Sequence, residues 1–145
     1  MLHSILVHSH SGLRYIVLGL LIYAIFNAWS LRSNYTKQDK LINLFAMVFC
    51  HVQLLLGIIL MFLSDKVNYG EGWIKNAQTR FYGMEHLLGM LAAITLITLG
   101  RRFAEGKELP ADKHKVIKKY YLIGLILILI SIPWPFREVL GAGWF

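Results

Sequence analysis

Charged residues are scarce in this sequence, and cysteine is almost absent. Only 16% of the 145 residues are charged while 57% are hydrophobic, which is far from the balance of a water-soluble domain. A soluble protein with so large an apolar core would need polar helices around it, and the chain is too short to supply them. The one cysteine, Cys50, excludes an internal disulfide and leaves the redox compartment open.

The charges are grouped in blocks that leave four long apolar stretches. We expect these stretches to form transmembrane helices over residues about 13–31, 41–64, 80–100 and 118–136. Such helices are about 28 to 36 Å long and match a hydrocarbon core of about 30 Å. The stretches are continuous and do not alternate, which excludes a β-barrel. The prediction is therefore an all-α integral membrane protein, a four-helix bundle with up-down topology in which residues 1–145 form a single transmembrane domain.

The distribution of lysine and arginine predicts the orientation, because cytoplasmic loops retain positive charge. The connections after the first and third spans, together with the first two residues of the fourth span, hold ten of the fifteen basic residues, namely Arg32, Lys37, Lys40, Arg101, Arg102, Lys107, Lys113, Lys115, Lys118 and Lys119. These two loops are expected in the cytoplasm, so the N and C termini are expected outside. The net charge of +7 is then explained by topology and anionic lipid, and no nucleic-acid partner is expected.

Polar and ionisable side chains within the spans are the candidates for function, because each is costly at membrane depth. His3 and His8 precede the first span, and His114 falls in the basic loop. The candidates are His10 and Arg14, which open the first span, His51 in the middle of the second, and Glu85 and His86 in the outer half of the third.

A stripe of small residues surrounds His86 on one predicted helix face. It comprises Thr79, Tyr82, Gly83, His86, Gly89, Met90, Ala93 and Gly100. Small residues at this spacing allow close helix packing in membranes. They also leave room for the edge of a flat macrocycle beside a ligating imidazole, so both interpretations place His86 inside the bundle.

The histidine-bearing faces of the first three spans converge in a four-helix bundle. Two neutral imidazoles from different helices bind a low-spin b-type haem, and an arginine near the surface can pair with a propionate. His86 is the shared ligand candidate, and its depth differs by about 11 Å from that of either His51 or His10. The partner histidine therefore stays open between these two, and Arg14 is the candidate for the propionate.

Other sites are possible on the same residues. His8 and His10 form an H-x-H pair that could bind a transition metal together with His86 or Glu85, and a quinone pocket is a further alternative. The sequence contains no nucleophile motif, P-loop or carboxylate pair. Transport is disfavoured because the spans lack broken helices.

Several segments resemble a known group of proteins. The segments HSHSGLRY, HVQLLLGIIL, MEHLLGMLAAITLITLG, IPWPF and GAGWF resemble short bacterial four-helix membrane proteins described as cytochrome b-like, and the similarity covers nearly the whole chain. Gln53 and Gly57 form a Q-x-x-x-G pattern similar to that of haem A synthase and b561-type cytochromes. Those proteins carry more histidines, commonly enough for two haems, and the fourth span here has none. The resemblance therefore implies one haem b at most.

The expected function is that of a membrane b-type cytochrome-like protein of the bacterial inner membrane, with several spans. It would bind one haem through His86 with His51 or His10, with Arg14 at a propionate, and take part in electron transfer, with quinol or with a partner protein. The alternative is a non-catalytic accessory subunit without cofactor, packed against a larger membrane complex or its own copies. Both readings place the chain in a lipid bilayer.

Overall fold

The computed structural model describes residues 1–30 and 34–144. This part of the chain is helical and contains no strand, which confirms the all-α class. Four helices are long, α1 (Leu2–Trp29), α2 (Lys37–Leu63), α4 (His86–Glu105) and α5 (Pro110–Ser131). Three elements are short, α3 (Ala77–Arg80), a π-helical segment η1 (Phe81–Glu85) and a 3-10 turn η2 (Glu138–Leu140).

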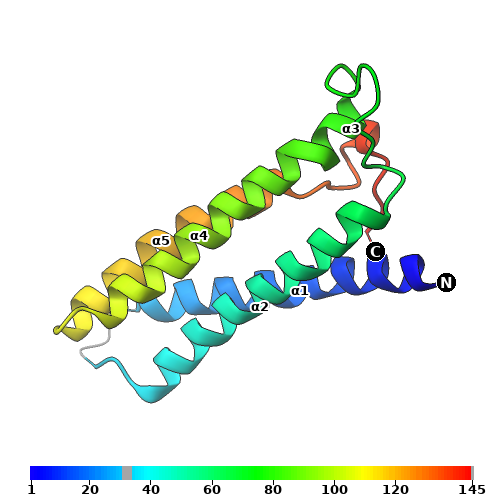
Figure 1. Ribbon diagram of the computed structural model, residues 1–145. Coiled ribbons are helices and arrows are strands. Elements are labelled where there is room, and N and C mark those ends of the chain that lie inside the picture. Colours follow the sequence, from blue (N-terminus) through cyan, green and yellow to red (C-terminus); the bar gives the residue numbers. More distant parts are fainter. Residues whose placement is uncertain (31–33, 145) are drawn as a thin grey trace.

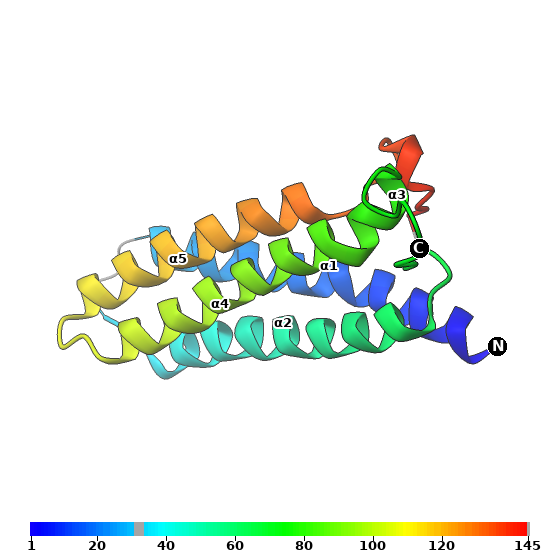
Figure 2. The same ribbon diagram turned by 45° about the horizontal axis from the view of Figure 1, so that its top comes forward.

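The four long helices form a bundle with up-down topology (Figures 1 and 2). Helix α1 packs against α2 and α5, and α4 packs against α5 and α2. Both termini lie at the end where α2 stops and α3 begins, whereas the α4–α5 connection lies at the opposite end (Figure 1). We call the first end, which carries His10 and His86, the histidine end. The second, which carries Asp39 and His114, is the basic end.

Within the described residues, three helical segments are long and apolar enough to cross a membrane, Leu2–Trp29, Lys37–Leu63 and Ala77–Glu105. The third combines α3, η1 and α4. Helix α5 is not among them, because four lysines occupy its first half (Lys113, Lys115, Lys118 and Lys119). Its apolar part, residues 120–131, extends only about 18 Å. The fourth expected span is therefore a basic helix with a short apolar end.

The expected boundaries differ from the observed ones. The span expected at 118–136 is helical only to Ser131, because Pro133 lacks an N–H and restricts Ile132 to an extended conformation with ψ 134°. Helix α1 begins at Leu2, well before residue 13, so the N-terminal histidines lie on the helix. The expected end of the first span at residue 31 lies outside the described residues.

Local sequence explains where helices begin. Thr36 caps α2 and forms a capping box with Asp39, in which each side chain accepts from the other residue's backbone N–H. The side chain of Asn76 accepts from the N–H groups of Gln78 and Thr79 and starts α3. Pro110 occupies the first turn of α5, where its missing N–H costs nothing.

The buried face of α1 repeats at steps of three and four residues. It contains Arg14, Val17, Leu21, Ala24 and Ala28, and it belongs to the histidine-bearing face that was expected to point into the bundle. Cys50 of α2, Ile97 of α4 and Tyr121 of α5 meet this face in one core. The interior is apolar along most of its length and polar near both ends.

The basic end contains a network of mutually bonded polar side chains. Asp39 is 1% exposed and accepts from Asn27 Nδ2 and from the backbone N–H and the hydroxyl of Thr36. The amide of Asn43 donates to the Tyr35 hydroxyl at 3.0 Å, and that hydroxyl donates to Glu105 at 3.3 Å. Burial raises the pKa of Tyr35, so this hydroxyl keeps its proton.

His114 belongs to this network, which corrects its assignment to a loop. It lies on α5, is 1% exposed and donates from Nε2 to the Asn34 carbonyl at 3.1 Å. Its ring packs edge-on against Tyr35 with 5.2 Å between ring centroids. This histidine therefore has a structural role, satisfied by the chain itself.

Candidate functional site

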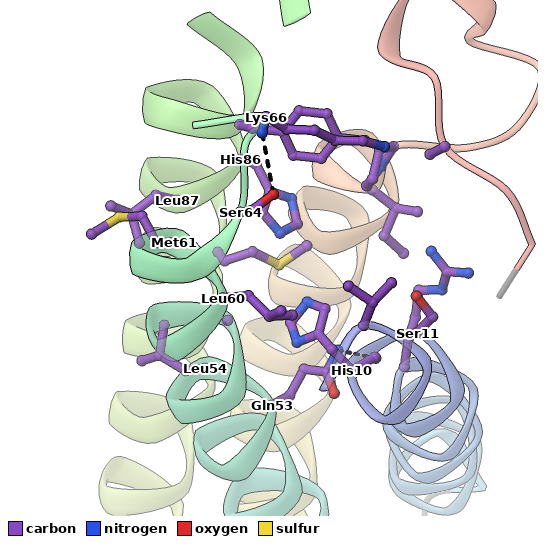
Figure 3. A pocket seen from close by; sticks show the side chains of 18 of the residues that line it. His10, Ser11, Gln53, Leu54, Leu60, Met61, Ser64, Lys66, His86 and Leu87 are labelled. Carbon is purple, nitrogen blue, oxygen red and sulfur yellow. Dashed lines mark hydrogen bonds between the residues drawn. The ribbon is translucent and has the colours of Figure 1, made fainter. Parts of the chain in front are cut away.

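A cavity of about 300 Å³ lies at the histidine end of the bundle. Its walls come from α1, α2, α4, α5 and the C-terminal segment, and most lining side chains are apolar. Figure 3 shows His10 and His86 on its walls with Gln53 and Leu60 of α2 nearby. No aspartate or glutamate occurs among the described residues that line it. An apolar cavity with a few polar groups is the usual form of a ligand site.

His86 is held by the end of helix α5. Its Nδ1 lies 2.7 Å from the carbonyl oxygen of Ser131. A carbonyl can only accept, so Nδ1 carries the proton and donates. This leaves Nε2 as the unprotonated nitrogen, and a histidine that donates from its other nitrogen to a carbonyl is the usual arrangement of a metal ligand.

The I-P-W-P segment explains why the Ser131 carbonyl is available. In a helix this oxygen would accept from the residue four positions later, which is Pro135 and has no N–H. The same argument applies to Leu129 and Pro133, and the Leu129 carbonyl accepts instead from the Trp134 indole at 2.8 Å. Two prolines thus free two carbonyl groups, and His86 uses one of them.

His10 faces His86 across the site. Their ring centroids are 6.4 Å apart and the ring planes make an angle of 75°. Among the described residues, His10 Nδ1 is a buried atom without a hydrogen-bond partner. The structure therefore brings together one of the two candidate ligand pairs, His10 with His86.

The expected depth difference between His10 and His86 was about 11 Å, and the observed proximity requires an explanation. The estimate measured each residue from the centre of its own span. Helix α1 begins eleven residues earlier than the span expected at 13, and the helices are inclined to one another (Figure 1). Helix geometry alone could not rank the two pairs.

His51 lies apart from the cavity. Its side chain is exposed on α2, where Nδ1 donates to the Met47 carbonyl at 2.9 Å and Nε2 lies 3.4 Å from the Thr98 hydroxyl. The buried face of α2 includes the neighbouring Cys50, and one residue along a helix is a rotation of about 100°. The pair His51 with His86 is not brought together.

Arg14 is buried beside the cavity and holds the C-terminal segment. It donates from Nη2 to the Trp144 carbonyl at 2.7 Å, while Lys66 donates to the Gly141 carbonyl at 2.6 Å. Between these anchors, Ala142 and Gly143 line the cavity. Residues 141–144, the C-terminal strap, therefore cover part of the site, and Arg14 has a structural partner as well as a place on the cavity wall.

The small residues near His86 mostly serve helix packing. A Cβ atom at Gly89 would lie 2.1 Å from Ser131 Oγ, and one at Gly100 would lie 2.3 Å from Tyr120 Cβ. Both glycines thus allow α4 and α5 to approach closely. The glycine next to a cavity histidine is Gly57 of α2, where a Cβ would lie 3.1 Å from His10 Cε1.

The two histidines of the H-x-H pair do not line the same site. His8 is exposed whereas His10 lines the cavity, since residues two apart on a helix point in different directions. Glu85 is exposed and pairs with Arg80 at 2.6 Å. Within the described residues, no group of three or more His, Cys, Asp or Glu side chains is placed to hold a metal ion.

Sequence reasoning missed the π-helical segment before His86 and the ring of Phe81 beside it. The π-helical segment Phe81–Glu85 immediately precedes His86, and such segments are frequent at functional sites. The buried ring of Phe81 lies 5.8 Å from that of His86 between centroids. No propensity rule identifies a single π turn. By contrast, the two prolines after Ser131 indicate in the sequence that carbonyl groups at the end of α5 have no helical N–H partner.

No family model, curated protein or solved structure matches this chain. The interpretation of the site therefore rests on its own geometry and on the sequence motifs. Two imidazoles face each other, one with its ring orientation fixed by a carbonyl, within an apolar cavity. This arrangement can hold a group that takes two axial nitrogen ligands and has an apolar body.

Proposed function

We propose that this chain is a membrane b-type cytochrome-like protein that binds one haem between His10 and His86 and takes part in electron transfer. One observation carries the proposal, the distance of 6.4 Å between the two ring centroids. Nitrogen–metal bonds of about 2.0 Å to two opposed imidazoles put their ring centres about 6 Å apart. The resemblance to cytochrome b-like proteins supports the same reading.

The residues present fit a haem. His86 offers Nε2 because Nδ1 is bound to Ser131, and Gly57 leaves space beside the His10 ring. Apolar side chains make up most of the cavity wall, and Arg14 and Lys66 on that wall would supply positive charge for the acidic groups of the haem. A haem held by these residues would supply a one-electron couple, and quinol or a partner protein would exchange the electron.

The proposal places the chain in the bacterial inner membrane with both termini outside. The three membrane-capable helices support insertion. The lysine-rich start of α5 lies at the end opposite both termini (Figure 2), which agrees with the positive-inside rule. In this orientation the His10–His86 site lies near the outer surface.

A spectrum of the purified protein tests the proposal. We expect protein expressed with adequate haem to show the α-band of a low-spin b-type cytochrome in a reduced-minus-oxidised spectrum. His10→Ala and His86→Ala should each abolish this band, whereas the matched variant His51→Ala should retain it. A wild-type protein without the band, or a band lost only in His51→Ala, would overturn the proposal.

The second candidate function is an accessory subunit without cofactor. It is favoured by α2, the least buried of the three membrane-capable helices, which exposes large apolar side chains including Phe45, Leu55 and Phe62. Such a face suits lipid, another subunit or a second copy of the chain. Isolation in mild detergent of a larger assembly in which this chain lacks haem would favour this function over the first.

A further inference from the structure

The ring of His10 lies close to Gly57 of α2. A Cβ atom at Gly57 would lie 3.1 Å from His10 Cε1, 3.8 Å from Nδ1 and 3.9 Å from Nε2. The first distance is shorter than ordinary van der Waals contact, so a larger residue at this position would require the imidazole to move by a few tenths of an ångström. Glycine at position 57 therefore allows the His10 ring to lie this close to α2.

The same helix also holds the backbone of His10. Gln53, one turn before Gly57, donates from Nε2 to the His10 carbonyl at 2.7 Å. The contact joins α2 to α1 at the residue that carries the imidazole. Gln53 and Gly57 thus fix the main chain and the ring of one histidine from one helix face.

Two buried polar atoms near this contact lack partners among the described residues, Gln53 Oε1 and His10 Nδ1. The first can only accept a hydrogen bond, and the second donates when Nε2 is the ligating nitrogen. Buried polar atoms in native proteins are nearly always paired. The two atoms are chemically complementary and belong to residues already in contact.

We propose that Gln53 and Gly57 are the positioning residues of His10, with Gly57 making room for the imidazole and Gln53 Oε1 accepting from Nδ1–H, directly or through a water molecule. The inference rests on the proposed function. Gln53 would then accept a hydrogen bond from His10 in the way that the Ser131 carbonyl accepts one from His86, so that each ligating histidine has one fixed acceptor.

The variant Gly57→Ala tests the steric part. The added methyl group would lie 3.1 Å from His10 Cε1 and should shift the ring by a few tenths of an ångström, so we expect altered g values of the oxidised low-spin haem in electron paramagnetic resonance, or loss of haem. The matched control is Gly12→Ala on α1, where a Cβ atom meets nothing within 4 Å, and its spectrum should equal that of wild type. Equal spectra for Gly57→Ala and wild type would overturn this part.

Variants of Gln53 test the hydrogen bond through the midpoint potential. An acceptor on Nδ1–H makes the imidazole a stronger donor and favours oxidised iron, so Gln53→Met should shift the potential to more positive values. Gln53→Glu keeps an acceptor oxygen, and its potential should lie below that of Gln53→Met. A potential unchanged in Gln53→Met, or equal in both variants, would overturn the role of Gln53.

These results separate the two proposals. A wild-type protein that binds no haem defeats the proposed function itself. A wild-type protein that binds haem, with unchanged resonance in Gly57→Ala and unchanged potential in Gln53→Met, defeats only the positioning role. Far-ultraviolet circular dichroism of each variant confirms that the bundle remains helical during the comparison.

Discussion

Both ends of the bundle bury histidine, yet the surroundings of these histidines differ. At the basic end, His114 donates to Asn34 and packs on Tyr35, and Asp39 accepts from Asn27 and Thr36. At the histidine end, His10 lines a cavity of about 300 Å³. At the basic end the polar side chains are hydrogen-bonded to one another, whereas at the histidine end several buried polar atoms have no partner within the described residues.

Most of the unpaired buried atoms lie at the histidine end. Four buried side-chain atoms of the described residues have no hydrogen-bond partner, and three of them, on His10, Arg14 and Gln53, belong to residues that line the cavity. The fourth is Nε of Arg101. A paired network stabilises and orients helices, whereas unpaired atoms around a cavity indicate a ligand. A histidine alone does not distinguish the two cases.

The largest effect on stability is expected at Asp39. Replacing it by alanine in Asp39→Ala leaves the buried amide of Asn27 without its acceptor and breaks the capping box, which should cost about 3 kcal/mol. Unfolding by denaturing detergent, followed by circular dichroism, measures the loss. The exposed control Asp65→Ala should change little. An Asp39→Ala protein as stable as wild type would show that the hydrogen-bond network of the basic end does not stabilise the bundle.

Substitutions at the two glycines of α4, Gly89 and Gly100, should lower stability alike but affect the haem spectrum differently. Gly89→Ala and Gly100→Ala each force α4 away from α5 and should cost about 1 to 3 kcal/mol. Gly89 touches Ser131, whose carbonyl holds His86, so only Gly89→Ala should also alter the haem spectrum. Equal spectra in both variants would contradict the role of Ser131 in orienting His86.

A smaller loss is expected from the structural histidine. His114→Leu removes the part-buried hydrogen bond to the Asn34 carbonyl, which should cost about 1 kcal/mol. The haem content should stay at the wild-type level, in contrast to His86→Ala. Haem content per protein, measured beside the unfolding curve, checks both statements. A haem content that falls with His114→Leu would remove the distinction between the two ends.

The smallest effect on stability is expected at the C-terminal strap. Lys66→Met removes one anchor on Gly141 and should change stability by about 0.5 kcal/mol or less. It should raise the rate of thiol labelling at Gly143→Cys in a Cys50→Ser background several-fold. The exposed Lys75→Met is the control. An unchanged labelling rate would show that Lys66 does not hold the strap over the cavity.

Sequence reasoning reached the helical class and the inward face of α1, because apolar runs and steps of three and four residues are local properties. It also singled out His10, Arg14 and His86, since buried polar groups stand out in an apolar chain. It misplaced His114 in a loop and extended the fourth span past Ser131. It kept His51 as a ligand candidate, although its neighbour Cys50 occupies the buried face.

By itself, the sequence determined that the chain is a bundle of long apolar helices with basic connections, because composition and charge blocks leave no other fold. Only the tertiary structure decided which histidines meet. The angle and offset between α1 and α4 bring the rings of His10 and His86 to 6.4 Å between centroids, and one residue of rotation leaves His51 outside. Such angles depend on side-chain packing between distant segments, which no local pattern records.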